Sequence, residues 1–186
     1  MKIKTEDIIL DSDPRIRTRS KKVELPLSAE DRELLEAMIT YVRNSQDDEI
    51  AEAEGLKPAI GIAAIQLGIP KKMIAISIPG AGEDEPDQEV ALANPRIVSR
   101  SVQPAYIESG EGCLSVENEH EGHVVRSARV KVKGYDLLTD QNVEIEAEGL
   151  FGICLQHETD HLSGVLFYDH IDPEDPFKEV DEAVVL

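Results

Sequence analysis

The sequence lacks the cysteines, the positive charge and the long apolar runs that several classes of protein require. Its two cysteines, Cys113 and Cys154, are too few for a disulfide framework. The 19 basic residues are outnumbered by 38 acidic ones, which gives a net charge of −19. This balance excludes a positive surface for nucleic-acid phosphates and disfavours docking on anionic lipid. No apolar run approaches the roughly 18 residues of a membrane span, and the N-terminus lacks the apolar core of a secretory signal. We therefore expect a soluble cytoplasmic protein without membrane contact or direct nucleic-acid binding.

The chain does contain enough apolar residues for one core, at 41% of its 186 residues. Since no repeat, low-complexity block or linker divides it, we expect residues 1–186 to form a single domain. The first 27 residues contain Pro14 and Pro26, which break any long helix. Behind the capping residue Ser28, apolar residues recur at helical spacing and predict an amphipathic helix over 29–45. The charged stretch 46–55 predicts a polar surface segment.

Strand patterns dominate the second half of the chain. Short apolar or alternating runs predict four strands, at 73–78, 90–99, 128–135 and 143–147. The expected connections are an acidic loop at 80–89 and turns at Lys133-Gly134 and 139–142, while Asn94-Pro95 interrupts the second strand. These connections are too short for repeated βαβ units and favour antiparallel sheets.

One more helix is expected near the C-terminus, over 149–162, with Gly164 at its left-handed end. The fold class is therefore α+β. The acidic tail 171–186 predicts a solvated extension, whose last residues, 183–186, either add a strand or cover a sheet edge.

The strongest local motif is H-E-x-x-H, at His157, Glu158 and His161. On a helix, residues four apart lie on one face, so both imidazoles can bind one metal ion. Glu158 lies beside that face and can take a proton from water at the metal. The alternative is a surface helix with two solvated histidines. The apolar residues on nearly all sides of this helix argue against it, because buried histidines and a carboxylate need partners.

A catalytic site of this kind needs a third protein ligand. The residues after His161 lack the extension of the metzincin peptidases, since the next histidine, His170, follows nine residues later instead of six. Cys113, within the sequence Glu-Gly-Cys-Leu-Ser, is the better candidate because a thiolate binds late divalent metals strongly. A buried structural cysteine is the alternative. A third segment, 59–68, combines small residues with Gln66, whose amide can donate to a ligand.

Taken in order, segments 59–66, 111–115 and 157–161 resemble the three motifs of the peptide deformylases, G-x-G-[hydrophobic]-A-A-x-Q, E-G-C-[hydrophobic]-S and H-E-x-D-H. The second and third motifs are complete. The long N-terminal helix, the extra segment near 44–57 and the sequence FYDHID resemble the Gram-positive-type, second-class members. This resemblance covers essentially the whole chain.

The resemblance implies antiparallel sheets around a central helix that bears H-E-x-x-H, with an additional N-terminal helix. It implies hydrolysis of the N-formyl group from the initiating methionine of new polypeptides. Cys113, His157 and His161 would hold one divalent metal ion, with water in the fourth position. Ferrous iron is the usual ion of the family, although zinc, nickel or cobalt can occupy such sites, and ligand type alone does not choose between iron and zinc.

By the same resemblance, Glu158 acts as general acid and base, and the Gln66 amide and the Leu114 backbone N–H stabilise the oxyanion. The slot for the methionine side chain and the adjoining substrate would be lined by five residues: Ile60, Gly61, Leu150, Ile153 and Cys154. Ordinary core packing is the alternative for these positions. Asp160 is expected to orient its helix through Arg126, and Glu111 to contact either substrate backbone or an arginine.

Two positions depart from the first motif, Ala59 in place of glycine and Ile65 where proline is common. An alanine at a glycine-only backbone angle would cost roughly 1 kcal/mol. One alternative is therefore a deformylase-like metalloprotein with altered substrate or reduced activity. Another is a small zincin-type peptidase, which accounts for the H-E-x-x-H motif alone. Ribosome association follows from the expected role, but no basic element of the sequence supports it.

Overall fold

The computed structural model describes residues 1–82 and 85–186. Of the expected acidic loop 80–89, Glu83 and Asp84 lie outside the described residues. The helices are α1 (Ala29–Asn44), α2 (Asp48–Glu54) and α3 (Gly149–His161), with short 3-10 helices η1 (Thr5–Asp7), η2 (Pro14–Arg17), η3 (Ala64–Leu67) and η4 (Phe167–His170). The strands are β1 (Gly61–Ala63), β2 (Met73–Ile78), β3 (Gln88–Arg100), β4 (Pro104–Tyr106), β5 (Arg126–Ser127), β6 (Arg129–Asp136), β7 (Gln141–Glu148) and β8 (Val184–Val185).

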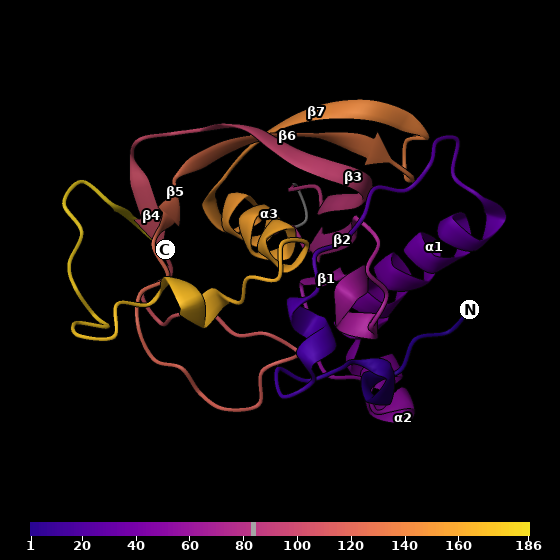
Figure 1. Ribbon diagram of the computed structural model, residues 1–186, viewed down its shortest axis with the longest axis horizontal. Helices are drawn as coiled ribbons and strands as arrows, with labels where there is room; N and C mark the ends of the chain where they lie inside the picture. The colour runs from indigo at the N-terminus through magenta and orange to yellow at the C-terminus, as the bar shows by residue number, and fades with distance from the viewer. Residues whose placement is uncertain (83–84) are drawn as a thin grey trace.

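Two sheets surround the helix that carries the H-E-x-x-H motif. The larger sheet is antiparallel, in the order β1-β2-β3-β6-β7, and the smaller has the order β5-β4-β8, with β8 parallel to β4. Figure 1 shows α3 at the centre, beneath the arch of β3, β6 and β7, with β4 and β5 beside one end. The predicted α+β class, with antiparallel sheets around this helix, is confirmed.

The composition of α3 explains its central place. Every residue from Phe151 to Glu158 is buried, as expected for a helix that is apolar on almost all sides. The core around it includes Ile74, Leu92 and Val132 from the large sheet. Gly164 follows the helix with a φ of +74°, the left-handed conformation predicted from its sequence position. The two histidines of the motif are therefore carried by a rigid element.

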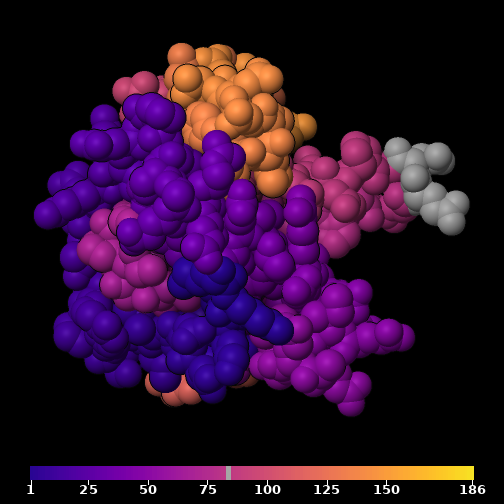
Figure 2. All heavy atoms as spheres, turned by 90° about the vertical axis from the view of Figure 1, so that its right-hand side faces the viewer, coloured from indigo at the N-terminus to yellow at the C-terminus, as the bar shows by residue number. Residues whose placement is uncertain are grey.

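The second expected helix is also present as α1. The Ser28 hydroxyl accepts a hydrogen bond from the Asp31 amide at 3.1 Å, which caps the helix. Its apolar stripe, including Leu35, Met38 and Val42, is buried in a second core cluster with Met73 of β2. Figure 2 shows the face on which the N-terminal segment and α1 cover much of the surface, with β6 and β7 in orange at one end.

The segment 46–55 lies at the surface, as predicted, and it also contains α2, none of whose residues is buried. The Asp47 carboxylate caps the Ile50 amide at 3.0 Å, and Gly55 ends the helix at φ +64°. One local prediction needs correction. Lys133-Gly134 is not a turn but lies inside β6, where a Cβ on Gly134 would meet the Ala93 carbonyl oxygen at 3.2 Å.

The interruption predicted at Asn94-Pro95 is present as an irregularity within β3. β3 continues through it with a shift in its pairing to β6, and Asn94 takes a φ of 54°. The Asn94 side-chain amide holds this conformation by bonding the backbone of Val23 at 2.9 Å in both directions.

The C-terminal residues form β8, which confirms the predicted extra strand. Among the described residues, no helix is long and apolar enough to cross a membrane.

Candidate metal centre and active site

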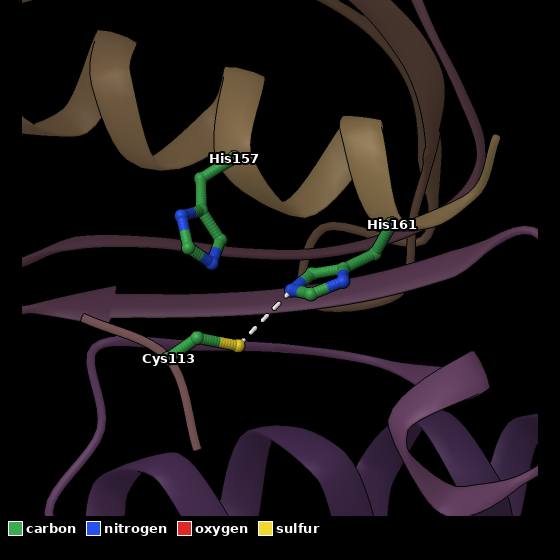
Figure 3. Close-up of side chains that lie close together, drawn as sticks. All are labelled: Cys113, His157 and His161. Atoms are coloured by element: carbon green, nitrogen blue, oxygen red, sulfur yellow. Dashed lines mark hydrogen bonds between the residues drawn. The ribbon is translucent and has the colours of Figure 1, made fainter. Parts of the chain in front are cut away.

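Three side chains that can bind a metal converge below α3. His157 and His161 project from successive turns of that helix, and Cys113 comes from the loop between β4 and β5 (Figure 3). Their ligand atoms all lie within 4.8 Å of one another, and Cys113 Sγ is 3.4 Å from His161 Nε2. The structure thus brings together the three residues predicted as ligands. Within residues 1–82 and 85–186, Cys154 belongs to no such cluster.

The donor set fits one divalent ion. Metal–sulfur and metal–nitrogen bonds of zinc-like length at a tetrahedral angle place sulfur and nitrogen about 3.6 Å apart, close to the 3.4 Å separation of Cys113 Sγ and His161 Nε2. Glu158 Oε2 and His161 Nδ1 are buried without a hydrogen-bond partner among the described residues. The Glu158 oxygen is costly to bury unless something in the site satisfies it, whereas His161 Nδ1 is the ring nitrogen opposite the one that faces Cys113.

A buried carboxylate orients His157. Glu111 Oε2 accepts a hydrogen bond from His157 Nδ1 at 2.8 Å, which leaves the other ring nitrogen free for a metal. Arg126 holds the same carboxylate in a bidentate pair, with Nε to Oε1 at 2.6 Å and Nη2 to Oε2 at 2.9 Å. Burial raises the pKa of Glu111, but hydrogen bonds from His157 and Arg126 outweigh it and the pKa falls below its usual value. Glu111 was expected to contact either the substrate backbone or an arginine, and the structure shows the contact with an arginine.

The network continues past Arg126 to the end of α3. Arg126 Nη1 donates to Asp160 Oδ2 at 2.8 Å, which confirms the predicted pair. His170 Nε2, on η4, donates to the same oxygen at 2.7 Å. His170 therefore has a structural contact within this network.

The Glu158 side chain lies beside the metal-ligand cluster and against Gly61, where any larger residue would collide with it. A Cβ added to Gly61 would lie 2.5 Å from Glu158 Oε1 and 3.0 Å from Cys154 Sγ. Burial raises the pKa of Glu158 to about 7, although the charges of His157 and Arg126 lower it. A carboxyl with a pKa near neutrality can both accept and return a proton.

Gln66 has a fixed amide orientation. Its Oε1 accepts a hydrogen bond from the Ala63 amide at 2.8 Å, so its Nε2 faces Cys113 Sγ at 3.5 Å and Ser115 Oγ at 3.2 Å. Leu114, the residue after Cys113, lines the same cleft. The two residues predicted to supply donors for the oxyanion, Gln66 and Leu114, thus both line this cleft.

A cleft of about 820 Å³ opens beside these residues. Among its lining residues are all five residues predicted to contact substrate: Ile60, Gly61, Leu150, Ile153 and Cys154. Burial raises the pKa of the Cys154 thiol well above its usual value, so this thiol stays neutral.

Several cleft residues were not predicted from the sequence, among them Gln46, Ile107 and Glu117. All three lie in irregular connections, where no periodic pattern marks them.

Ala59 does not sit at a glycine-only backbone angle. It is absent from the residues with positive φ, so the expected strain is not present. Its amide donates to Ser45 Oγ at 3.1 Å, and its carbonyl accepts from Gln46 Nε2 at 2.8 Å. The Ala59 backbone is therefore fully bonded at the edge of the cleft.

A cysteine and two histidines around one ion site, next to a buried carboxylate and a peptide-sized cleft, define a metal-dependent hydrolase. The model of the polypeptide deformylase family matches residues 5–177. Peptide deformylase 2 of Bacillus subtilis is 45% identical over 99% of this chain and 98% of its own length. Peptide deformylase 2 of Geobacillus stearothermophilus is 44% identical over 98% and 97%.

Solved structures of peptide deformylases are also similar to this chain. The peptide deformylase of Thermotoga maritima superposes with a TM-score of 0.68 at 32% identity, covering 89% of this chain and 97% of that one. An Acinetobacter baumannii deformylase with Met-Ala-Ser bound gives 0.68 at 30% identity, covering 88% and 96%. The chain belongs to the polypeptide deformylase family, metal-dependent hydrolases that remove the formyl group from N-terminal formylmethionine.

Proposed function

We propose that this chain carries out the family's reaction in the 820 Å³ cleft, on formylmethionyl ends of newly made polypeptides. The observation that carries the proposal is the buried Glu158 carboxyl beside the Cys113, His157 and His161 cluster. Substrates of this kind are made on ribosomes, which places the activity in the cytoplasm. The whole chain, residues 1–186, acts as one catalytic domain.

Cys113, His157 and His161 would hold the ion through one sulfur and two imidazole nitrogens. When bound, a divalent ion there supplies Lewis acidity, which activates water and polarises the formyl carbonyl. Ferrous iron is the proposed physiological ion, and zinc, nickel and cobalt also suit one thiolate with two imidazoles. The Glu111 bond to His157 Nδ1 supports this assignment, because it fixes the ring with its second nitrogen toward the cluster.

Glu158 moves the proton in this scheme. Its carboxylate takes a proton from the attacking water, whose oxygen bonds to the formyl carbon. The carbon–nitrogen bond then breaks, and Glu158 returns the proton to the departing amine, so that formate and a free N-terminus are released. Gln66 Nε2 and the Leu114 N–H donate to the carbonyl oxygen as it becomes negative. The locked orientation of the Gln66 amide supports its role.

The apolar part of the cleft suits the methionine side chain. Ile60, Leu150, Ile153 and Cys154 supply apolar surface near the cluster, and Gly61 lets the substrate backbone approach. The Acinetobacter relative with Met-Ala-Ser supports a peptide in the corresponding cleft.

The test compares two isosteric substitutions in the same cleft. Glu158→Gln should keep one equivalent of metal and lose about 10²–10⁴-fold in kcat on a formyl-Met peptide. Glu117→Gln removes the same charge from an exposed residue that also lines the cleft, and should stay within a few-fold of the unmodified protein. Near-normal turnover in Glu158→Gln would show that another group moves the proton.

A further inference from the structure

The third metal ligand sits on a segment without regular structure. The ligand loop, residues 107–125, joins β4 to β5 and contains no helix or strand. It carries Glu111 and Cys113, whereas the two histidines are held by α3. The distance between Cys113 and the histidines therefore depends on what fixes this loop. Downstream of Cys113, the Ser115 carbonyl accepts from the Asp11 amide at 2.7 Å.

The C-terminal tail, residues 171–186, bonds the start of the ligand loop. β8 pairs with β4, and the Leu186 amide donates to the Tyr106 carbonyl at 3.0 Å. The Glu108 amide, inside the loop, donates to the Leu186 carbonyl at 2.9 Å. In Figure 1 the tail, in yellow, leaves η4, runs outward and returns to end beside β4. Ile107, which lines the cleft, lies between the two bonded residues.

The same tail bonds the far end of the loop. The His123 amide donates to the Pro176 carbonyl at 2.7 Å, and its ring Nδ1 donates to the Lys178 carbonyl at 3.1 Å. The His123 ring also stacks on Tyr106, with centroids 4.1 Å apart, and meets the edge of Phe177 at 5.5 Å. The contact between tail and loop is thus close at both ends.

We propose that the C-terminal tail is a positioning clamp, which holds the ligand loop so that Cys113 stays at bonding distance and Ile107 keeps its place in the cleft. The inference rests on the proposed metal site. The clamp acts through backbone hydrogen bonds and ring stacking instead of charge: among the described residues, none of the tail's acidic side chains beyond Ile171 forms an ion pair. Its last residues, 178–186, also extend past the region that matches the family model.

A matched pair of proline substitutions tests the clamp. Proline lacks the amide hydrogen, so Leu186→Pro removes the bond to Tyr106. Amides alternate in direction along a strand, so the Val185 amide faces away from β4 and Val185→Pro spares the ladder. Truncation after Ala183 removes the strand altogether.

The readouts are metal release and loop exchange. From nickel-loaded protein mixed with a chromogenic chelator, Leu186→Pro and the truncated chain should lose metal about tenfold faster, with a higher KM, while Val185→Pro matches the unmodified chain. In metal-free protein, amide hydrogens of the ligand loop should exchange faster in the first two variants, with those of α3 unchanged.

Equal metal release, KM and loop exchange in Leu186→Pro and Val185→Pro would overturn the clamp. Loss of metal in high salt from the unmodified chain would also contradict it, because the contacts are not ionic. Both the release rate and the exchange rate are measured without substrate. A failure of the deformylase assignment would therefore leave these results readable.

Discussion

Replacing Arg126 with methionine is expected to destabilise the protein severely, because it leaves the buried Glu111 carboxylate and the partly buried Asp160 without their shared cation. The Arg126 and Glu111 side chains are 3% and 4% exposed, and their two hydrogen bonds are 2.6 and 2.9 Å long. Asp160, at 19% exposure, shares the same guanidinium. Breaking a buried pair by removing one partner costs about 3–5 kcal/mol of unfolding free energy. For a chain of this size, that corresponds to a melting temperature lower by about 6–20 °C.

The assay is urea unfolding of metal-free protein, with the double variant Glu111→Gln and Arg126→Met beside each single one. Because the double variant buries no unpaired Glu111 carboxylate, its loss should be smaller than the sum of the single losses. The experiment uses chelated protein so that loss of metal does not add to the change.

The cost of Arg126→Met should also depend on pH. The native pKa of Glu111 is lowered, so its contribution to stability is present above the unfolded pKa and fades as pH falls through the folded value. Without Arg126, only the bond from His157 would still oppose burial, so the pKa of Glu111 would be higher than in the unmodified protein. The difference between the two proteins should therefore shrink in acid. A cost below about 1 kcal/mol, which is the value of a surface ion pair, would show that Arg126 does not neutralise a buried carboxylate. A cost that does not change with pH would show the same.

Four further substitutions probe the site. Gly61→Ala should push the Glu158 carboxylate aside, since the new Cβ would lie 2.5 Å from its oxygen, and should lower kcat at least tenfold with metal content retained; unchanged kcat would show that the carboxylate is not held there. Cys113→Ala should lose most bound metal, whereas Cys154→Ala should keep about one equivalent in elemental analysis, and equal losses would contradict the ligand assignment. Ala59→Gly should leave kcat/KM within a few-fold and lower unfolding free energy by about 0.4–1 kcal/mol; a large gain in activity would mean that Ala59 restrains catalysis.

The elements with a clear period were predictable from the sequence. Helix α1 follows from its cap and from the spacing of its apolar residues. Helix α3 follows from the H-E-x-x-H motif within an apolar segment, because two histidines and a glutamate in a buried helix need a metal as partner. Helix α2 was not predicted because its signals are the Asp47 cap and Gly55, without an apolar stripe. The sequence predicts a turn at Gly134, whereas the glycine is there because the Ala93 backbone of β3 approaches it closely. Ala93 lies about forty positions away in the chain, so no local pattern indicates this contact.

At the site, the sequence predicts which residues bind the metal but not the hydrogen bonds that position the surrounding segments. Cys113, His157 and His161 belong to short motifs whose chemistry can be recognised locally. The bonds from Gln46 to Ala59, from His170 to Asp160 and from the tail to His123 join residues on separate elements or connections. No spacing rule predicts such contacts, because they depend on how loops meet in three dimensions.

One metal ion in the Cys113, His157 and His161 site is expected to drive deformylation. The experiment is to measure formate release from formyl-Met-Ala-Ser by protein purified without oxygen, with metal content determined on the same sample. Activity should rise in proportion to ferrous iron up to one equivalent, and it should be lost in Glu158→Gln at full occupancy. Full occupancy by ferrous iron or nickel without formate release would show that the metal in this site does not deformylate the peptide.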